Sequence, residues 1–94
     1  KTLLMVFSEF GRRVRENGSL GTDHGAAAPM FLLGERVQGG LHGDPPDLRN
    51  LDGNNDLQMQ LDFRRVYATV LDWLGGDPEA VLGKGFNPLA LVRA

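Results

Sequence analysis

The sequence predicts a mixed α/β fold, and three stretches carry that prediction. Leu3–Phe7 and Pro29–Leu33 are continuous apolar runs of strand length. From Phe63 to Leu74 the apolar residues recur at helical spacing. A continuous apolar run is typical of a strand covered on both faces, so we expect two buried strands and one amphipathic helix.

The first strand is expected to deliver the polar segment Ser8–Arg12 at its C-terminal end, where open α/β sheets place their sites. Arg12–Gly21 has neither a helical nor an alternating period and contains an Asn-Gly pair, which predicts a loop. The next tetrad, Thr22–Gly25, sets a carboxylate beside an imidazole just before the second strand. These are metal-ligating groups in a turn.

The region Gly43–Gln60 is rich in proline, glycine, asparagine and aspartate, so loops and turns are expected there. Apolar and polar residues alternate from Leu57 to Asp62, which makes a short polar hairpin arm plausible.

The helix is expected to begin after Asp62, a natural N-cap, and to end at the pair Gly75–Gly76. Its expected apolar stripe consists of Phe63, Val66, Tyr67, Val70, Leu71 and Leu74. We assign Tyr67 and Trp73 to helix packing rather than to ligand stacking. The glycine-rich tail after the helix is expected to be loop, with Phe86 and Leu89 docking onto the core.

Composition limits the classes of function. The chain has 94 residues and a net charge of -2, with no basic stripe, so nucleic acid is not an expected partner. It has no cysteine, so any metal must be held by oxygen and imidazole ligands. No stretch approaches the roughly 20 apolar residues of a membrane span, and no signal-peptide pattern opens the chain. Residues 1–94 are expected to form one domain or part of a larger one.

The order of these motifs resembles the C-terminal part of an uncharacterised bacterial sulfatase-like family, a domain of unknown function in the alkaline phosphatase superfamily. The resemblance spans nearly the whole chain, from Ser8–Arg12 through the Thr22–Gly25 tetrad to the helix Asp62–Gly75. It implies that residues 1–94 are a C-terminal fragment of an alkaline-phosphatase-like doubly wound sheet. It also implies a site for two divalent cations, zinc or manganese, that hydrolyses phosphoric or sulfuric esters.

The resemblance can be transferred to these residues in two registers. In the first, Asp23 and His24 form the superfamily's Asp-His metal pair, and His42 is the later histidine ligand. In the second, which we prefer, Glu9 supplies the carboxylate of that pair and His24 is the later histidine. Phe10 then stands where the pair has its histidine, and Phe10 cannot bind a metal. The resemblance also places the nucleophile upstream of the matched part, so the fragment alone should be inactive.

Each of these residues also has a structural interpretation. Asp23 can close an Asx-turn while His24 bonds to backbone, Glu9 can form an ion pair with Arg12 or Arg13, and His42 can be an ordinary loop residue. In the hydrolase hypothesis, Glu9, Asp23 and His24 are metal ligands and Arg12 holds the anionic phosphate or sulfate ester.

Two other hypotheses stay open. The domain can retain the fold without catalysis and bind a ligand or a cell-envelope partner, or it can be a structural fragment that completes a larger sheet. In the last case an unpaired strand edge would seek the remainder of the parent domain or a second copy. Export to the periplasm is implied by the resemblance alone.

Overall fold

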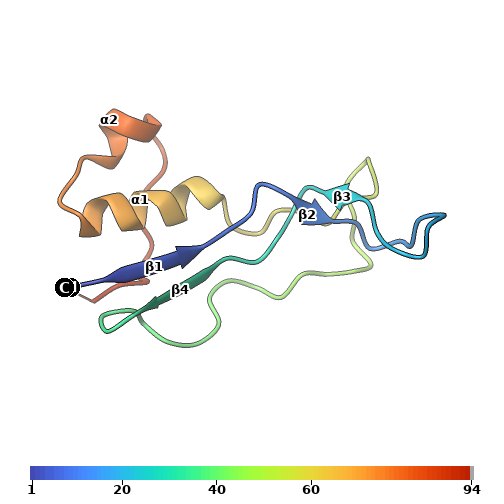
Figure 1. The fold of residues 1–94 in the computed structure, drawn as a ribbon. Helices are drawn as coiled ribbons and strands as arrows, with labels where there is room; N and C mark the ends of the chain where they lie inside the picture. Colours follow the sequence, from blue (N-terminus) through green and yellow to red (C-terminus); the bar gives the residue numbers. More distant parts are fainter. Residues whose placement is uncertain (94) are drawn as a thin grey trace. The chain divides into compact units, whose positions relative to one another are not determined.

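The computed structural model describes residues 1–93, which form four short strands and two helices (Figure 1). The elements are β1 (Leu3–Val6), β2 (Gly11–Arg12), β3 (His24–Gly25), β4 (Phe31–Gly34), α1 (Phe63–Trp73) and α2 (Pro78–Leu82). The fold is therefore mixed α/β, and both apolar runs contain a strand, as the sequence predicts.

The strands form two separate two-stranded sheets, β1 with β4 and β2 with β3. Both pairs are antiparallel, and the opposed arrows of β1 and β4 are visible in Figure 1. A doubly wound sheet is built from parallel strands. Residues 1–93 show the mixed α/β class but no such parallel sheet.

Contacts divide the chain into two compact units. The helix unit consists of Lys1–Leu3, Gly34–Gly43 and Leu61–Ala94, and the strand unit consists of Leu4–Leu33 and Asp44–Gln60.

Helix α1 begins and ends where the sequence predicts. The Asp62 carboxylate caps its N-terminus by accepting a hydrogen bond from the Arg64 backbone N–H at 2.9 Å. The same carboxylate forms an ion pair with the Arg64 guanidinium at 2.6 Å, and these hydrogen bonds lower the pKa of Asp62 from 3.8 to about 2. Gly75 then leaves the helix with φ +84°, a conformation that glycine adopts without strain.

The buried face of α1 is narrower than the predicted stripe. Its most buried residues are Val66, Ala68 and Thr69, whereas the stripe's two ends, Phe63 and Leu74, are exposed. The stripe was therefore wrong at both ends, and it omitted Ala68 and Thr69. Hydrophobicity alone does not mark a small residue or a threonine whose hydroxyl has partners.

Thr69 connects α1 to the C-terminal tail of the helix unit. Its hydroxyl donates to the Arg65 carbonyl oxygen and accepts from the Leu89 backbone N–H, both at 2.8 Å. Further along, Leu91 is only 8% exposed, and Val37 and Val92 form an antiparallel bridge. Leu89 is half-buried and donates its backbone N–H to Thr69 of α1, which confirms that this part of the tail docks onto the helix.

Helix α2 corrects the expectation that this tail is entirely loop. Asp77 caps the helix by accepting from the Glu79 backbone N–H at 3.1 Å, Pro78 occupies its first turn, and Gly83 follows it with φ +87°. Asp77 and Pro78 form a regular helix start signal and Gly83 a regular stop signal, but only five residues lie between Asp77 and Gly83. The helix is too short to show a period in the sequence.

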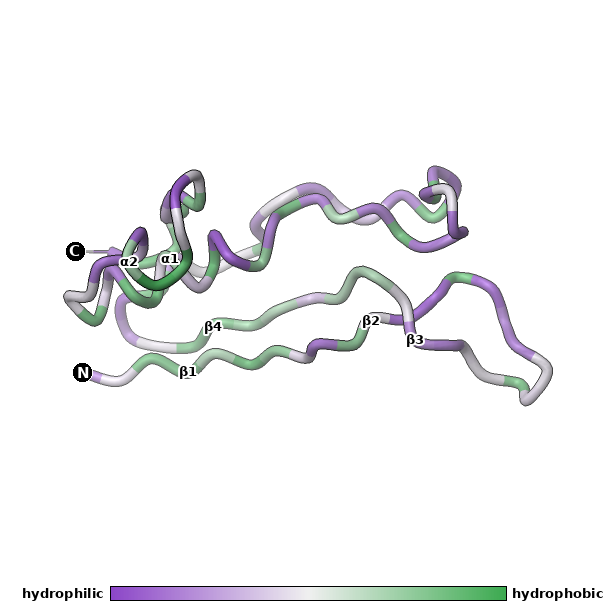
Figure 2. Tube along the Cα trace, turned by 90° about the horizontal axis from the view of Figure 1, so that it is seen from above, coloured by the Kyte–Doolittle hydropathy of each residue, from purple (hydrophilic) through white to green (hydrophobic). Residues whose placement is uncertain are grey.

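The expectation that both strands are buried on two faces is also wrong for residues 1–93. Leu4 and Val6 of β1 are about half exposed, at 54% and 45%, and alternate with less exposed neighbours. On β4, Phe31 and Leu33 are similarly exposed. Figure 2 shows the apolar character of both strands. Such alternation is typical of an antiparallel pair with one covered face, which a continuous apolar run does not reveal.

The predicted polar arm is present in a reduced form. A single antiparallel bridge joins Leu51 to Leu57, and Asp52 N–H donates to the Asp56 carbonyl oxygen at 2.9 Å. Leu57 therefore pairs with Leu51, on the other side of the turn between them. Met59, which belongs to the expected alternating segment, is exposed. None of the helices described is long and apolar enough to span a bilayer.

Candidate functional site

The Thr22–Gly25 tetrad lies partly on a strand of the strand unit. His24 and Gly25 form β3, which pairs with β2 so that Arg12 faces His24 and Gly11 faces Gly25. The Arg13 backbone N–H extends this ladder by donating to the Asp23 carbonyl oxygen at 3.0 Å. A side chain at Gly25 would lie 2.8 Å from the Arg12 carbonyl carbon. The close approach of the two strands thus requires glycine here.

Cross-strand pairing places Arg12 and His24 next to each other. Directly opposed residues of an antiparallel pair project to the same face, with Cβ atoms roughly 5 Å apart. Both residues are exposed, and Arg12 donates from Nη1 to the Thr22 carbonyl oxygen at 2.7 Å. A guanidinium and an imidazole therefore share one exposed face.

Phe10 covers one side of the His24 ring. The two ring centroids are 4.3 Å apart and the planes are 20° from parallel. Phe10 is thus in direct contact with His24. In the preferred register, Phe10 occupies the position where the superfamily has a histidine ligand. It supplies an apolar contact instead of a second imidazole.

Asp23 is held by the loop that precedes it. Asn17 Nδ2 donates to Asp23 Oδ1 at 3.1 Å, so the Asp23 carboxylate has a defined partner. This contact joins two side chains, whereas an Asx-turn would join the Asp23 carboxylate to a backbone N–H.

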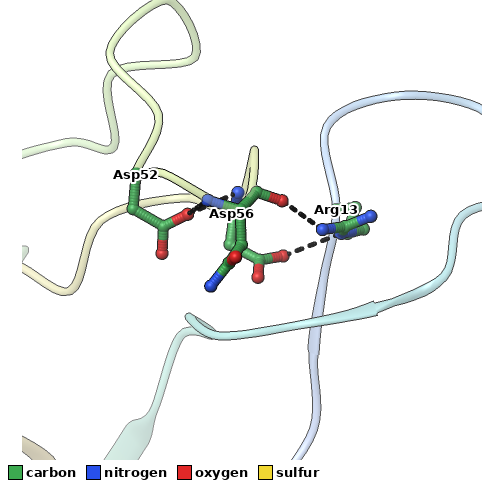
Figure 3. A network of polar contacts seen from close by, with 4 residues as sticks. Arg13, Asp52 and Asp56 are labelled. Atoms are coloured by element: carbon green, nitrogen blue, oxygen red, sulfur yellow. Dashed lines mark hydrogen bonds and ion pairs between the residues drawn. The ribbon is translucent and has the colours of Figure 1, made fainter.

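A second polar network lies in the same unit (Figure 3). Arg13 Nε donates to Asp56 Oδ1 at 3.0 Å, and its Nη2 donates to the Asn54 carbonyl oxygen. Asp52 Oδ1 accepts from the backbone N–H groups of Asn54 and Asp56 at 2.9 and 3.0 Å. Arg13 thereby ties the β2 end to a turn 43 residues further along the chain.

The remaining predicted ligands are Glu9 and His42. Glu9 is exposed just after β1. His42 belongs to the helix unit, where its Nε2 lies 2.7 Å from the Gln38 carbonyl oxygen. Within residues 1–93 no group of three or more histidine, aspartate or glutamate side chains could hold a metal ion. The donor types of Asp23 and His24 suit zinc or manganese, but they can contribute only part of a coordination shell.

A groove of about 490 Å³ in the helix unit is lined by Trp73, Thr69 and the cationic residues Lys1, Arg36 and Arg93, among others. None of the predicted site residues lines it.

Sequence reasoning missed Asn17 and Arg13 as organising residues. The only signal for Asn17 was the Asn-Gly pair, which indicates a turn but not the contact with Asp23. For Arg13 there was no local signal, because its partners are remote in sequence.

These features define a mixed α/β chain with a polar site on a short antiparallel strand pair. Residues 1–88 match the sequence model of a family described as a protein of unknown function, DUF1501, and the chain belongs to that family. No curated protein and no solved structure matches the chain.

Proposed function

We propose that this chain is part of a metal-dependent phosphoric or sulfuric ester hydrolase domain and that it contributes anion- and metal-binding groups rather than the nucleophile. The single observation that carries the proposal is the pairing of Arg12 with His24 on β2 and β3. It sets a guanidinium beside an imidazole on an exposed face, next to the Asp23 carboxylate in sequence.

The chemistry of this pair suits an anionic ester. The Arg12 guanidinium has five N–H donors and uses one of them, on Nη1, for the Thr22 carbonyl oxygen. Guanidinium forks bind phosphate and sulfate oxygens bidentately. The antiparallel ladder fixes the backbone on which both side chains stand, so an ester oxygen would meet pre-positioned groups.

A divalent cation bound nearby would polarise the ester and help to generate a nucleophile. Under this proposal His24 and Asp23 each supply one ligand. The rest of the coordination shell and the nucleophile lie outside this chain, as the resemblance to the alkaline phosphatase superfamily suggests.

Manganese binding tests the metal part of the proposal. Paramagnetic Mn²⁺ added to labelled protein should broaden the nuclear magnetic resonance signals of Asp23 and His24 first. His24→Ala should remove this effect, and the matched variant His42→Ala should retain it. Broadening that is unchanged in His24→Ala would refute ligation by His24.

Anion binding and catalysis need separate measurements. Inorganic phosphate should shift the amide signals of β2 and β3, and Arg12→Ala should weaken that response. A chromogenic phosphate or sulfate ester should not be hydrolysed by the chain alone. Turnover by the purified chain would contradict the placement of the nucleophile elsewhere.

The stacking of Phe10 on His24 favours a second candidate, a non-catalytic domain that binds a ligand or a cell-envelope partner. Phe10→His separates the two. In the hydrolase proposal the added imidazole should strengthen Mn²⁺ binding at the tetrad, whereas a purely apolar docking surface would lose its partner without gaining metal affinity.

A further inference from the structure

Asn17 organises the loop of residues 17–21, called here the Asn17 loop. Its backbone N–H donates to the Gly21 carbonyl oxygen at 2.7 Å. Its side-chain Oδ1 accepts from the backbone N–H groups of Ser19 and Gly21 at 2.8 and 3.1 Å. Leu20 has a φ of +63°, a conformation that a leucine rarely adopts. The Asn17 bonds stabilise that turn.

The other end of the Asn17 amide faces the tetrad. Nδ2 donates to Asp23 Oδ1 at 3.1 Å. One side chain therefore closes the loop through its oxygen and holds the Asp23 carboxylate through its nitrogen. Only an amide can do both at this position, since a carboxylate has no donor at neutral pH.

The residue after Asn17 is Gly18, and an Asn-Gly pair can cyclise. The backbone nitrogen of Gly18 can attack Cγ of Asn17, forming an N–Cγ bond and a five-membered succinimide. The Cγ–Nδ2 bond breaks and ammonia leaves, carrying away the proton lost by the Gly18 nitrogen. Water then opens the ring to aspartate or isoaspartate. Gly18 is exposed, and a Cβ there would meet no atom within 4 Å, so the loop leaves open space around this residue.

We propose that Asn17–Gly18 is a deamidation site whose reaction is controlled by opening of the Asn17 loop, and that deamidation releases Asp23. Cyclisation needs Cγ of Asn17 to turn toward the Gly18 nitrogen. The three hydrogen bonds of the side chain oppose that movement. The closed loop therefore protects Asn17, and local opening exposes it.

The aspartate formed by deamidation cannot make the hydrogen bond that Asn17 donates to Asp23. An aspartate at position 17 can still accept from Ser19 and Gly21, but it cannot donate to Asp23. Two carboxylates then replace a donor–acceptor pair whose atoms lie 3.1 Å apart, and their repulsion drives them apart. The inference concerns the loop itself and holds whether or not the site binds a metal.

Deamidation kinetics test the control by the loop. The full chain is incubated at mildly alkaline pH, with and without urea, and the peptide containing Asn17 is followed by mass spectrometry. We expect deamidation to be at least about tenfold slower in the folded chain than in urea. Asp23→Ala, which removes the Nδ2 acceptor, should accelerate the folded-state reaction. Equal rates in buffer and urea, or no effect of Asp23→Ala, would overturn the proposal.

Gly18→Ala is the matched chemical control. Nothing in the structure obstructs the added methyl group, and it hinders attack by the backbone nitrogen. Deamidation in urea should become much slower while the loop bonds persist. A rate in urea that is unchanged by Gly18→Ala would show that the reaction does not proceed through this succinimide.

The consequence for Asp23 is tested by a swap of the two side chains. Asn17→Asp should speed hydrogen exchange at the Ser19 and Gly21 amides, because repulsion from the Asp23 carboxylate opposes the closed position in which residue 17 accepts from them. The α1 amides should be unchanged. Combining it with Asp23→Asn restores one donor and one acceptor in reversed order and should restore slow exchange. An Asn17→Asp loop as protected as wild type, or a double variant no better than the single one, would refute the role assigned to the amide.

Discussion

Replacing Thr69 by valine tests the connection between α1 and the C-terminal tail. Thr69 is only 4% exposed, and its hydroxyl is the acceptor for the part-buried Leu89 N–H at 2.8 Å. Valine has nearly the same shape, so the change removes the hydroxyl without opening a large cavity. A buried donor left without a partner costs about 1–3 kcal/mol. For a chain of this size, that lowers the melting temperature by roughly 10 °C.

Thr69→Ser is the matched control. It keeps both hydrogen bonds and removes one methyl group, which costs about 0.8 kcal/mol. Thermal unfolding gives the two stabilities, and hydrogen exchange at the Leu89 amide reports the lost bond directly. We expect faster Leu89 exchange in Thr69→Val than in Thr69→Ser. The reasoning fails if the valine variant is as stable as the serine variant, or if its Leu89 amide is as protected as in wild type.

Three further changes address the strand pair, the tail and the helix cap. Gly11→Ala places a methyl group against a neighbouring backbone and should destabilise the chain by about 3 kcal/mol in chemical unfolding, whereas Gly18→Ala should change little. Leu91→Ala should cost about 2–3 kcal/mol, because Leu91 is buried although it lies beyond the matched residues 1–88; stability equal to wild type would place it outside the core. The pKa of Asp62 is lowered from 3.8 to about 2 by its bonds to Arg64, so this stabilisation is complete above pH 3.8 and is lost as the pH falls toward 2. Asp62→Asn should remove that step from an acid titration of helical circular dichroism, and an unchanged titration would contradict the assignment.

The sequence was most informative where a local rule decides the structure. Asp62 as N-cap and Gly75 as stop predict α1 almost to the residue, because capping and positive φ are properties of one or two side chains. The two strand segments were predicted because an apolar run of strand length is also a local feature of the sequence. Their burial was not predicted correctly, since an apolar run does not show how many faces of a strand are covered.

The candidate site was predictable in its residue types but not in its contacts. The Asp23-His24 pair was visible in the sequence, but the position of His24 on β3 depends on pairing with β2 across a loop that shows no period. The ring contact of Phe10 with His24 follows from that same pairing. Glu9 and His42 were grouped with the tetrad by resemblance, and the described residues do not form a metal cluster with them.

The polar partners of the tetrad show what a short motif leaves out. Asp23 is held on its side chain by Asn17 and on its backbone by Arg13, and Arg13 is in turn fixed by Asp56. None of these three residues belongs to the Thr22–Gly25 tetrad. Asp23 immediately precedes the two-residue strand β3, so the partners that order its carboxylate and backbone come from elsewhere in the chain. The chemistry available to Asp23 is consequently set by Asn17 and Arg13 as much as by the histidine beside it.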